Sequence, residues 1–247
     1  VGQENTVLVF RNLEQLTVED EAILLEYSDA HHVDVWLQPK GPDTVYPFYP
    51  QREALYYDLP EFGVRMPYRP TDFTQVNFHI NRVLVGRAVR LLDVRSNERV
   101  ADFFCGLGNF TLPLATKATH VVGVEGSTQL NERALQNAKV NGLDHKTEFH
   151  CRNLFEVTAD DLRGLGRLDK YLVDPPREGA EALCLALADL AENERPKRIV
   201  YVSCNPGSLA RDAGILVNNA GYTIKSAGVV NMFPHTAHVE SIAVFEQ

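Results

Sequence analysis

Long apolar runs, cysteine pairs and metal-ligand spacings are all missing from this sequence of 247 residues. No apolar run approaches the roughly 20 residues that a membrane-spanning helix needs. The four cysteines, at positions 105, 151, 184 and 204, form no C-x-x-C pair and no zinc-ligand spacing. This usage argues against a disulfide framework and a metal cage, and it is typical of a reducing cytoplasm. We therefore expect a cytoplasmic protein with no metal site and no membrane association.

Positive charge is scarce as well. The formal net charge is −9, from 24 Lys and Arg against 33 Asp and Glu. Because phosphate binding favours a basic field, this balance argues mildly against a nucleic-acid partner. The sequence begins without a methionine or a signal-peptide pattern, which predicts that it is a fragment of something longer. No feature of the sequence indicates an obligate protein partner.

Residues 1–70 mix short strand-like runs with one helix, which predicts a small α+β region. The stretches TVLVF and VDVWLQ have the apolar content of strands. Between them, Thr17 and Asp20 have capping-box spacing at the start of a helical pattern over residues 17–30. The segments EALYYDL and VRMPY predict a hairpin, and numerous prolines keep the rest of the region in loops.

From residue 71 to residue 247, strand and helix patterns alternate, which predicts a parallel α/β sheet. The last two strands, within residues 222–233 and 238–247, are joined by a short turn at Pro234 and so must run antiparallel. A seven-stranded, mostly parallel sheet with an antiparallel C-terminal hairpin is typical of class I, Rossmann-like S-adenosylmethionine-dependent methyltransferases. The other expected strands are Val100–Phe103, His120–Val124, Thr147–His150, Tyr171–Val173 and Ile199–Val202, and the expected helices cover about 78–93, 109–117, 127–141, 179–191 and 207–219.

The stretch VADFFCGLGNF, residues 100–110, predicts a strand that enters a glycine turn and then a helix. Gly106 and Gly108 let the backbone approach a ligand, and the helix start offers free N–H groups. Thr111 stands where a dinucleotide fingerprint needs a third small residue. Glu125, at the end of the next strand, is placed to accept hydrogen bonds from a ribose diol. A nucleoside cofactor is favoured over a plain tight turn, and S-adenosylmethionine over NAD.

The stretch YLVDPPREG, residues 171–179, ends the fourth strand at Asp174. The two prolines fix an extended loop and present Asp174 at the edge of the sheet, although a plain turn also explains them. An aromatic residue after Asp-Pro-Pro would favour methylation of an amino group, but Arg177 takes that place.

The stretch RIVYVSCNPGSLARD, residues 198–212, places Cys204 where the fifth strand ends, on the ligand-binding edge of an open α/β sheet. Cys204 is therefore a candidate nucleophile, although a buried structural thiol remains an equal alternative. The antiparallel last strand begins at the same edge and brings Glu240 toward the level of Cys204 and Asp174. His238 and Glu240 are expected on one face of this strand, because side chains alternate.

Several of these stretches resemble the signatures of the RNA (uracil-5-)-methyltransferase family. They are DPPREG, IVYVSCNPGSLARD and VNMFPHTAHVE, and FTQVN and DFFCGLGNFTLPLA are most similar to members that act on bacterial 23S ribosomal RNA. The resemblance covers residues 71–247 and, more loosely, the region before them. Asn231 stands where the family usually has Asp, and Ser208 where it usually has Thr.

This resemblance implies a role for each matching position. Cys204 would be the nucleophile and Glu240 the base, with His238 as the second choice of base. Asp174 would also lie near the target uracil, as would His238 and, more weakly, Phe73. The residues that would contact S-adenosyl-L-methionine are Gln75, Phe104, Asn109, Glu125, Asn153 and Asp174.

The implied function is S-adenosylmethionine-dependent methylation of C5 of a uridine in 23S ribosomal RNA, through a covalent adduct between the cysteine and C6. Family members also carry an RNA-binding barrel and an iron–sulfur site, but no cysteine precedes position 105 here. An iron–sulfur cluster is therefore expected only in a missing N-terminal region. The alternatives are methylation of transfer RNA or another ribosomal uridine, amino-group methylation at the Asp-Pro-Pro-Arg loop, and a noncatalytic RNA-binding remnant.

Overall fold

The structure, a computed structural model, describes residues 5–52 and 55–247. It contains two compact units, one formed by Val1–Asp58 with Arg65–Thr74 and the other by Leu59–Val64 with Gln75–Gln247. The sequence predicts a boundary at residue 70, and the long segment of the larger unit begins at Gln75. No helix in the described ranges is long and apolar enough to cross a membrane.

The smaller unit contains a three-stranded sheet in the order β1-β2-β3, with β1 parallel and β3 antiparallel to β2. The predicted helix forms α1 and begins with the expected capping box between Thr17 and Asp20. Strand β3 occupies the region predicted to be loop, because Pro47 is compatible with a strand at the edge of a sheet. These elements are β1 (Val7–Phe10), α1 (Val18–His31), β2 (Asp34–Leu37), η1 (Pro42–Thr44) and β3 (Tyr46–Tyr49).

The predicted hairpin is a separate two-stranded sheet of β4 (Leu55–Leu59) and β5 (Val64–Tyr68), joined by the short helix η2 (Pro60–Phe62). Glu53 and Ala54, at the start of the predicted first strand, lie outside the described residues.

The larger unit is built on a seven-stranded sheet in the order β11-β12-β10-β9-β6-β7-β8. The neighbouring strands from β10 to β8 pair in parallel, whereas β12 pairs antiparallel with both β10 and β11. This confirms the predicted methyltransferase-like fold. The strands are β6 (Arg99–Phe103), β7 (His120–Glu125), β8 (Thr147–Cys151), β9 (Lys170–Val173), β10 (Arg198–Ser203), β11 (Thr223–Val230) and β12 (Glu240–Glu246).

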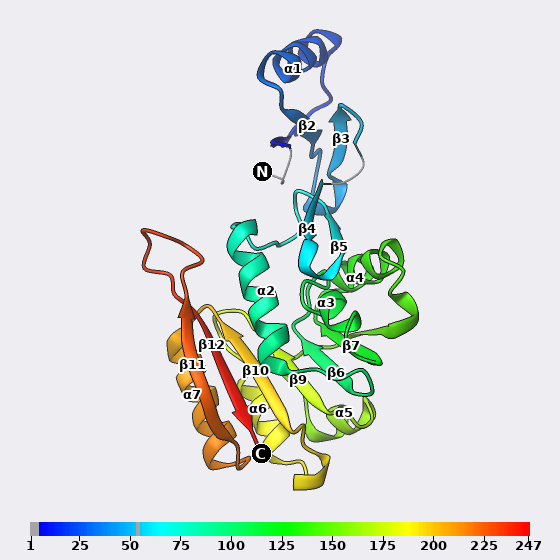
Figure 1. Cartoon of the computed structure of the whole chain (residues 1–247). Helices are drawn as coiled ribbons and strands as arrows, with labels where there is room; N and C mark the ends of the chain where they lie inside the picture. Colours follow the sequence, from blue (N-terminus) through cyan, green and yellow to red (C-terminus); the bar gives the residue numbers. More distant parts are fainter. Residues whose placement is uncertain (1–4, 53–54) are drawn as a thin grey trace. The chain divides into compact units, whose positions relative to one another are not determined.

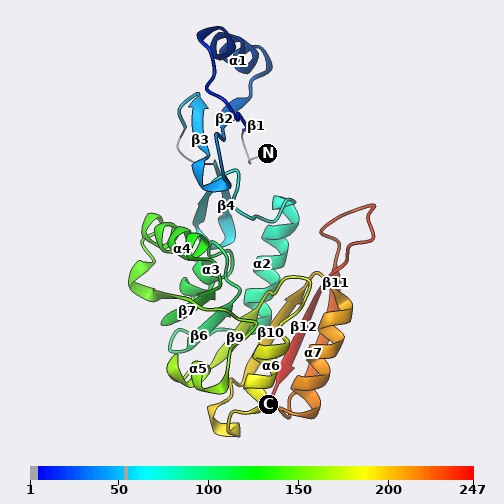
Figure 2. The ribbon, with the colours of Figure 1, turned by 180° about the vertical axis from the view of Figure 1, so that it is seen from behind.

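Helices cover both faces of this sheet. Helix α2 lies on the face turned toward the viewer in Figure 1, whereas Figure 2 shows α5, α6 and α7 on the opposite face. A continuous apolar core fills the space between these three helices and the sheet, and it includes Phe103, Tyr201 and Leu216. The helices are α2 (Phe78–Leu92), α3 (Thr111–Ala115), α4 (Thr128–Val140), η3 (Asp144–Lys146), α5 (Ala159–Gly164), α6 (Glu181–Ala188), η4 (Glu192–Glu194) and α7 (Pro206–Asn218).

The sequence analysis missed one helix and predicted one connection too short. The short helix α5 was not predicted, because one and a half turns give too little periodicity to recognise. The connection between β11 and β12 covers residues 231–239 and is longer than the short turn expected at Pro234. His238 therefore lies in this connection and not on the strand that begins at Glu240.

Candidate active site

The carboxyl ends of the parallel strands meet at one edge of the seven-stranded sheet, beyond which ligands bind in open α/β folds. Because β12 is antiparallel, its first residue, Glu240, lies at the same edge as the end of β10. In Figure 1 the connection between β11 and β12 also extends from this edge. The loops that leave this edge carry nearly all of the predicted site residues.

The loop after β6 has an unusual backbone. Gly106 and Gly108 have φ angles of 54° and 97°, in the left-handed region that favours glycine. Phe104 has a φ angle of 63°, although a side chain makes this region costly by about 1–2 kcal/mol. A Cβ atom placed on Gly106 would meet no atom within 4 Å. Open space therefore adjoins this loop, and strain of this kind is common at functional sites.

Glu125, the last residue of β7, ties two loops together with its carboxylate. Its Oε2 accepts a hydrogen bond from Gly106 N at 3.0 Å, and its Oε1 accepts one from Ser127 N at 2.9 Å. Each oxygen keeps a second lone pair, so the carboxylate can still accept hydrogen bonds from two neighbouring hydroxyl groups. This geometry suits the predicted role of Glu125 toward a ribose.

An aromatic pair lies at the glycine loop, and only one of its two members, Phe104, was predicted. The rings of Phe104 and Phe155 meet edge to face, with centroids 5.9 Å apart, and Phe155 is 52% exposed. Asn153 stands next to Phe155, and its Oδ1 accepts a hydrogen bond from Phe155 N at 3.1 Å. The structure thus brings Phe104 and the Asn153 loop together. The exposed Phe155 is an apolar surface that sequence reasoning missed.

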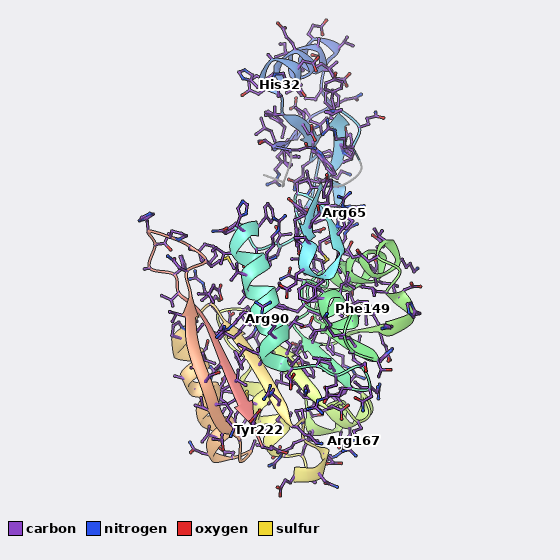
Figure 3. The ribbon with its side chains drawn as sticks, in the orientation of Figure 1. His32, Arg65, Arg90, Phe149, Arg167 and Tyr222 are labelled. Atoms are coloured by element: carbon purple, nitrogen blue, oxygen red, sulfur yellow. The ribbon has the colours of Figure 1, made fainter. Side chains whose placement is uncertain are left out.

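Cys105, in the same loop, is a core residue. A Cβ atom on Gly123 of β7 would lie 2.7 Å from the Phe149 ring and 3.0 Å from Cys105 Sγ, so both side chains fill the space that glycine leaves. Phe149 is labelled in Figure 3. Burial raises the pKa of the Cys105 thiol well above its ordinary value. These features do not suit a nucleophile.

Residues at the start of α2 form hydrogen bonds both to the glycine loop and to the segment that joins β11 and β12. The side-chain amides of Asn81 and Asn109 bond to each other in both directions, at 2.9 and 3.0 Å. Asn77 caps the helix through Ile80 N, and its Nδ2 donates to Met232 O at 3.3 Å. Gln75 lies half-buried just before this cap. Sequence reasoning missed Asn81, although its place on the apolar face of the helix was a signal.

Cys204 lies between the end of β10 and the start of α7. Ser203 Oγ bonds the backbone of Asn205 and closes a tight turn around the cysteine. Asn205 then caps α7 by accepting from Gly207 N at 3.0 Å. Its Nδ2 donates to the carbonyl oxygen of Arg177 at 3.0 Å, which joins this turn to the loop after β9. The half-buried thiol is thereby held at the edge of the sheet.

Two carboxyl groups lie at the same edge as Cys204, on the strands that flank β10. Ser203 pairs with Ser241, so Glu240 begins the neighbouring strand one position beyond this pair. Glu240 is only 4% exposed, and burial raises the pKa of its carboxyl. Asp174 follows β9, and burial beside Glu240 and Asp102 raises its pKa to about 8. Burial and the charges of Glu240 and Asp174 also raise the pKa of the Cys204 thiol.

His238 has a different neighbour from the one expected. Arg177 Nη2 donates a hydrogen bond to His238 Nδ1 at 2.8 Å, and the ring meets Phe233 edge to face. His238 is exposed whereas Glu240 is buried, so the expectation that they share one face of a strand was wrong. The reason is a local turn before β12, in which His238 N donates to Thr236 Oγ1 at 3.2 Å.

A buried network holds the Asp-Pro-Pro-Arg loop against α7, and sequence reasoning missed it. Asp212 is fully buried, and its Oδ2 accepts from Tyr201 Oη at 2.6 Å and from Ala180 N at 2.7 Å. Gly179 has a φ angle of 83°, and a Cβ there would lie within 3 Å of Arg211, Asp212 and Ser208 atoms. The loop can pack this closely only because residue 179 has no side chain.

Phe73 belongs to the smaller unit, and its side chain is 75% exposed. Its predicted contact with the target uracil stays a prediction. In the described part of the chain, no group of three or more His, Cys, Asp or Glu side chains is arranged to hold a metal ion.

The family profile described as "tRNA (Uracil-5-)-methyltransferase" matches residues 51–247. The chain belongs to this uracil-5-methyltransferase family. It is 65% identical over 250 residues to the "23S rRNA (uracil(1939)-C(5))-methyltransferase RlmD" of Cupriavidus necator, covering 100% of this chain and 57% of that protein. It is 66% identical over 250 residues to the protein of the same name from Burkholderia pseudomallei, covering 100% and 54%. The chain thus spans little more than half of these curated relatives.

Among solved structures, the family member tRNA (uracil-54, C5)-methyltransferase of Pyrococcus abyssi, in complex with S-adenosyl-L-homocysteine, is similar over nearly the whole chain. The TM-score is 0.76 at 26% sequence identity, and the match covers 98% of this chain and 57% of that one. The structure of TYW2 from M. jannaschii in complex with AdoMet has a TM-score of 0.57 at 17% identity and covers 87% of this chain and 93% of that one, a similarity of fold alone.

Proposed function

We propose that this chain is the methyl-transferring part of an enzyme that methylates C5 of a uridine in 23S ribosomal RNA, with S-adenosyl-L-methionine as the methyl donor. The observation that carries the proposal is the strand register, which brings a half-buried thiol, Cys204, and two carboxyl groups, Glu240 and Asp174, to the same edge of the sheet. The names of the relatives that are 65% and 66% identical support the choice of ribosomal RNA.

The residues around the glycine loop fit the cofactor. Glu125 offers two carboxylate oxygens with free lone pairs, which can accept hydrogen bonds from both hydroxyls of a ribose. The space beside Gly106 is open, and the partly exposed Phe104–Phe155 pair provides an apolar wall for a base. Asn109 and Asn153 add polar groups at the rim of the same loops. When bound there, S-adenosyl-L-methionine supplies an electrophilic methyl group.

Uracil C5 is too weakly nucleophilic to take a methyl group directly, and this is why a thiol is needed. In the proposed reaction, the Cys204 thiolate forms a bond to C6, and the electrons of the C5–C6 double bond move toward O4. C5 then forms its bond to the methyl carbon as the carbon–sulfur bond of the donor breaks. The product is a methylated uracil that remains attached to Cys204.

Release of the product needs a base. Glu240 takes the proton from C5, the C5–C6 double bond forms again, and the thiolate leaves C6. A buried carboxyl with a raised pKa is a stronger base than an exposed one, which favours Glu240 in this role. His238 is the weaker candidate, because its Nδ1 already accepts a hydrogen bond from Arg177.

The target uracil must leave its stack to reach the edge of the sheet, as in other enzymes that act on bases. Asp174 lies beside Cys204 and is proposed to bind the polar edge of this uracil. Phe73 and His238 are proposed as further contacts to the RNA. Because this reaction takes place on ribosomal RNA, we place the protein in the cytoplasm.

The test is methylation of 23S ribosomal RNA by the purified chain with S-adenosyl-L-methionine, followed by mass spectrometry of the nucleosides. The proposal predicts 5-methyluridine with the native sequence and none with Cys204→Ser. Methyl groups found on an exocyclic nitrogen, or 5-methyluridine formed equally well by Cys204→Ser, would contradict it.

A further inference from the structure

Asp212 of α7 joins two segments of the candidate active site through one buried carboxylate. Its side chain is fully buried, and its Oδ2 accepts hydrogen bonds from Ala180 N at 2.7 Å and from Tyr201 Oη at 2.6 Å. Ala180 follows the Asp-Pro-Pro-Arg loop, whereas Tyr201 lies on β10, three residues before Cys204. The carboxylate thus connects the segment that carries Asp174 with the segment that carries Cys204.

The other oxygen of this carboxylate, Oδ1, is bound by a cation. Arg211 Nε donates to Asp212 Oδ1 at 2.8 Å, and Arg211 Nη2 donates to the carbonyl oxygen of Glu178 at 2.8 Å. Arg211 Nη1 also forms an ion pair with Glu181 Oε2 at 3.3 Å. One guanidinium therefore compensates the buried carboxylate and ties the loop after β9 to α7.

These contacts act on the main chain of the loop after β9. Asn205, which follows Cys204, adds a link from its Nδ2 to the carbonyl oxygen of Arg177 at 3.0 Å. The loop is therefore bound through main-chain groups of Arg177, Glu178 and Ala180. Replacing a buried ionic network with apolar packing often leaves stability unchanged, so stability alone does not explain this one. The bonds instead fix the path of the loop.

We propose that Asp212 and Tyr201 are positioning residues, which hold the loop that carries Asp174 in a fixed place relative to the turn that carries Cys204. The inference rests on the proposed function, in which both groups must meet the same uracil ring. Addition of a thiol to C6 requires a narrow range of distances and angles, and a misplacement of about 1 Å can slow a reaction on the order of 100-fold. Both positioning residues act through the loop and the turn, and neither contacts the uracil.

The experiment compares two variants that each lose one buried tyrosine hydroxyl. Tyr201→Phe removes the hydrogen bond to Asp212, whereas Tyr222→Phe removes the one that Tyr222 Oη donates to Pro196 O at 2.7 Å. Tyr222, labelled in Figure 3, lies just before β11, and the strand register places it at the opposite edge of the sheet from Cys204. Both variants should lose stability, so a merely structural role would affect them alike.

The measured quantity is the rate of 5-methyluridine formation in a single turnover, with 23S ribosomal RNA and S-adenosyl-L-methionine both saturating. The temperature is one at which circular dichroism shows each variant to be folded, so a loss of stability alone does not change the rate. Tyr201→Phe should lower this rate by at least about threefold, whereas Tyr222→Phe should keep the native rate. Asp212→Asn keeps the size of the side chain but loses one acceptor oxygen, and it should lower the rate by at least about tenfold.

Because the two positioning residues share one hydrogen bond, the double variant should be no slower than Asp212→Asn alone. A native rate in Tyr201→Phe or in folded Asp212→Asn, or an equal loss in Tyr201→Phe and Tyr222→Phe, would overturn the inference and leave the proposed function intact. If Asp212→Asn does not fold, the comparison of the two tyrosine variants decides. If the native sequence forms no 5-methyluridine in this assay, the proposed function fails, and the inference fails with it.

Discussion

The carboxylate of Glu125 accepts a hydrogen bond from the backbone N–H of Gly106 at 3.0 Å, which joins the end of β7 to the loop after β6. The two residues lie at the carboxyl ends of adjacent parallel strands. The same carboxylate accepts from Ser127 N, so one side chain orders both loops that border the open space beside Gly106. The hydrogen bonds thus give Glu125 a role in ordering the two loops, and the proposed function adds a second role toward a ribose.

Replacing Glu125 with Ala should weaken the binding of S-adenosyl-L-homocysteine by roughly tenfold or more. The reason is that a hydrogen bond to a charged group contributes about 1.5–3 kcal/mol. Isothermal titration calorimetry measures the change, and circular dichroism checks that the variant is folded. Glu132→Ala, on the exposed surface of α4, is the control and should bind normally. Unchanged affinity in folded Glu125→Ala would rule out the proposed site.

Asp174 should make stability depend on pH. Its pKa is about 8 in the folded protein against an ordinary value of 3.8, so the folded state binds the proton more tightly than the unfolded state does. The resulting stability is fully present below the lower value and is lost as pH rises toward 8. Each unit of difference between the folded and unfolded pKa corresponds to about 1.4 kcal/mol in the free energy of unfolding.

Asn does not titrate, so the stability of Asp174→Asn should not fall in this way. The melting temperature of the variant should therefore exceed that of the native sequence by more at about pH 8.5 than at about pH 5.5. Differential scanning calorimetry at the two pH values measures the gain. The exposed Asp189→Asn should change stability equally at both. A gain for Asp174→Asn that does not grow with pH would show that the carboxyl titrates normally.

Gly179→Ala should be more damaging than Gly142→Ala. Both residues have positive φ angles, 83° and 65°, so both variants incur the cost of a left-handed side chain. Only at Gly179 would the new Cβ meet buried neighbours, Asp212 and Ser208 among them, whereas nothing lies within 4 Å at Gly142. Overpacking of this kind costs about 1–3 kcal/mol in stability, in addition to the cost of the left-handed backbone.

Urea denaturation of both variants measures this difference. We also expect Gly179→Ala, but not Gly142→Ala, to slow methyl transfer, because the crowded loop carries Asp174. Equal losses of stability in the two variants would mean that the loop moves aside at no cost.

The fold was largely predictable because most strands of the seven-stranded sheet are buried, rich in valine and separated by helical patterns or glycine turns. The order of the motifs then fixed which residues reach one edge of the sheet, and this brought Cys204, Asp174 and Glu240 together. Strand β3 was not predictable in the same way, because Pro47 disfavours a strand unless it lies at an edge. Edge positions are decided by tertiary pairing, which the local sequence does not encode.

The supporting contacts of the site were mostly missed. Asn81 of α2 meets Asn109 of the loop after β6, and Tyr201 of β10 meets Asp212 of α7. Each pair depends on the packing of separate elements, so neither residue alone indicates its partner. His238 was misplaced for a related reason, since its contact with Arg177 comes from a turn that simple alternation along a strand does not anticipate.

The most direct test of the account separates the nucleophile from the base. Glu240→Gln keeps nearly the same shape but is a poor base, so addition and methyl transfer should proceed while removal of the C5 proton stalls. With unmodified 23S ribosomal RNA and S-adenosyl-L-methionine, a methylated RNA–protein adduct should accumulate on denaturing gels. Mass spectrometry should place the link on the peptide containing Cys204, and Cys204→Ala should form no adduct. Turnover of Glu240→Gln at the native rate, or a link on Cys105 or Cys151, would contradict the account.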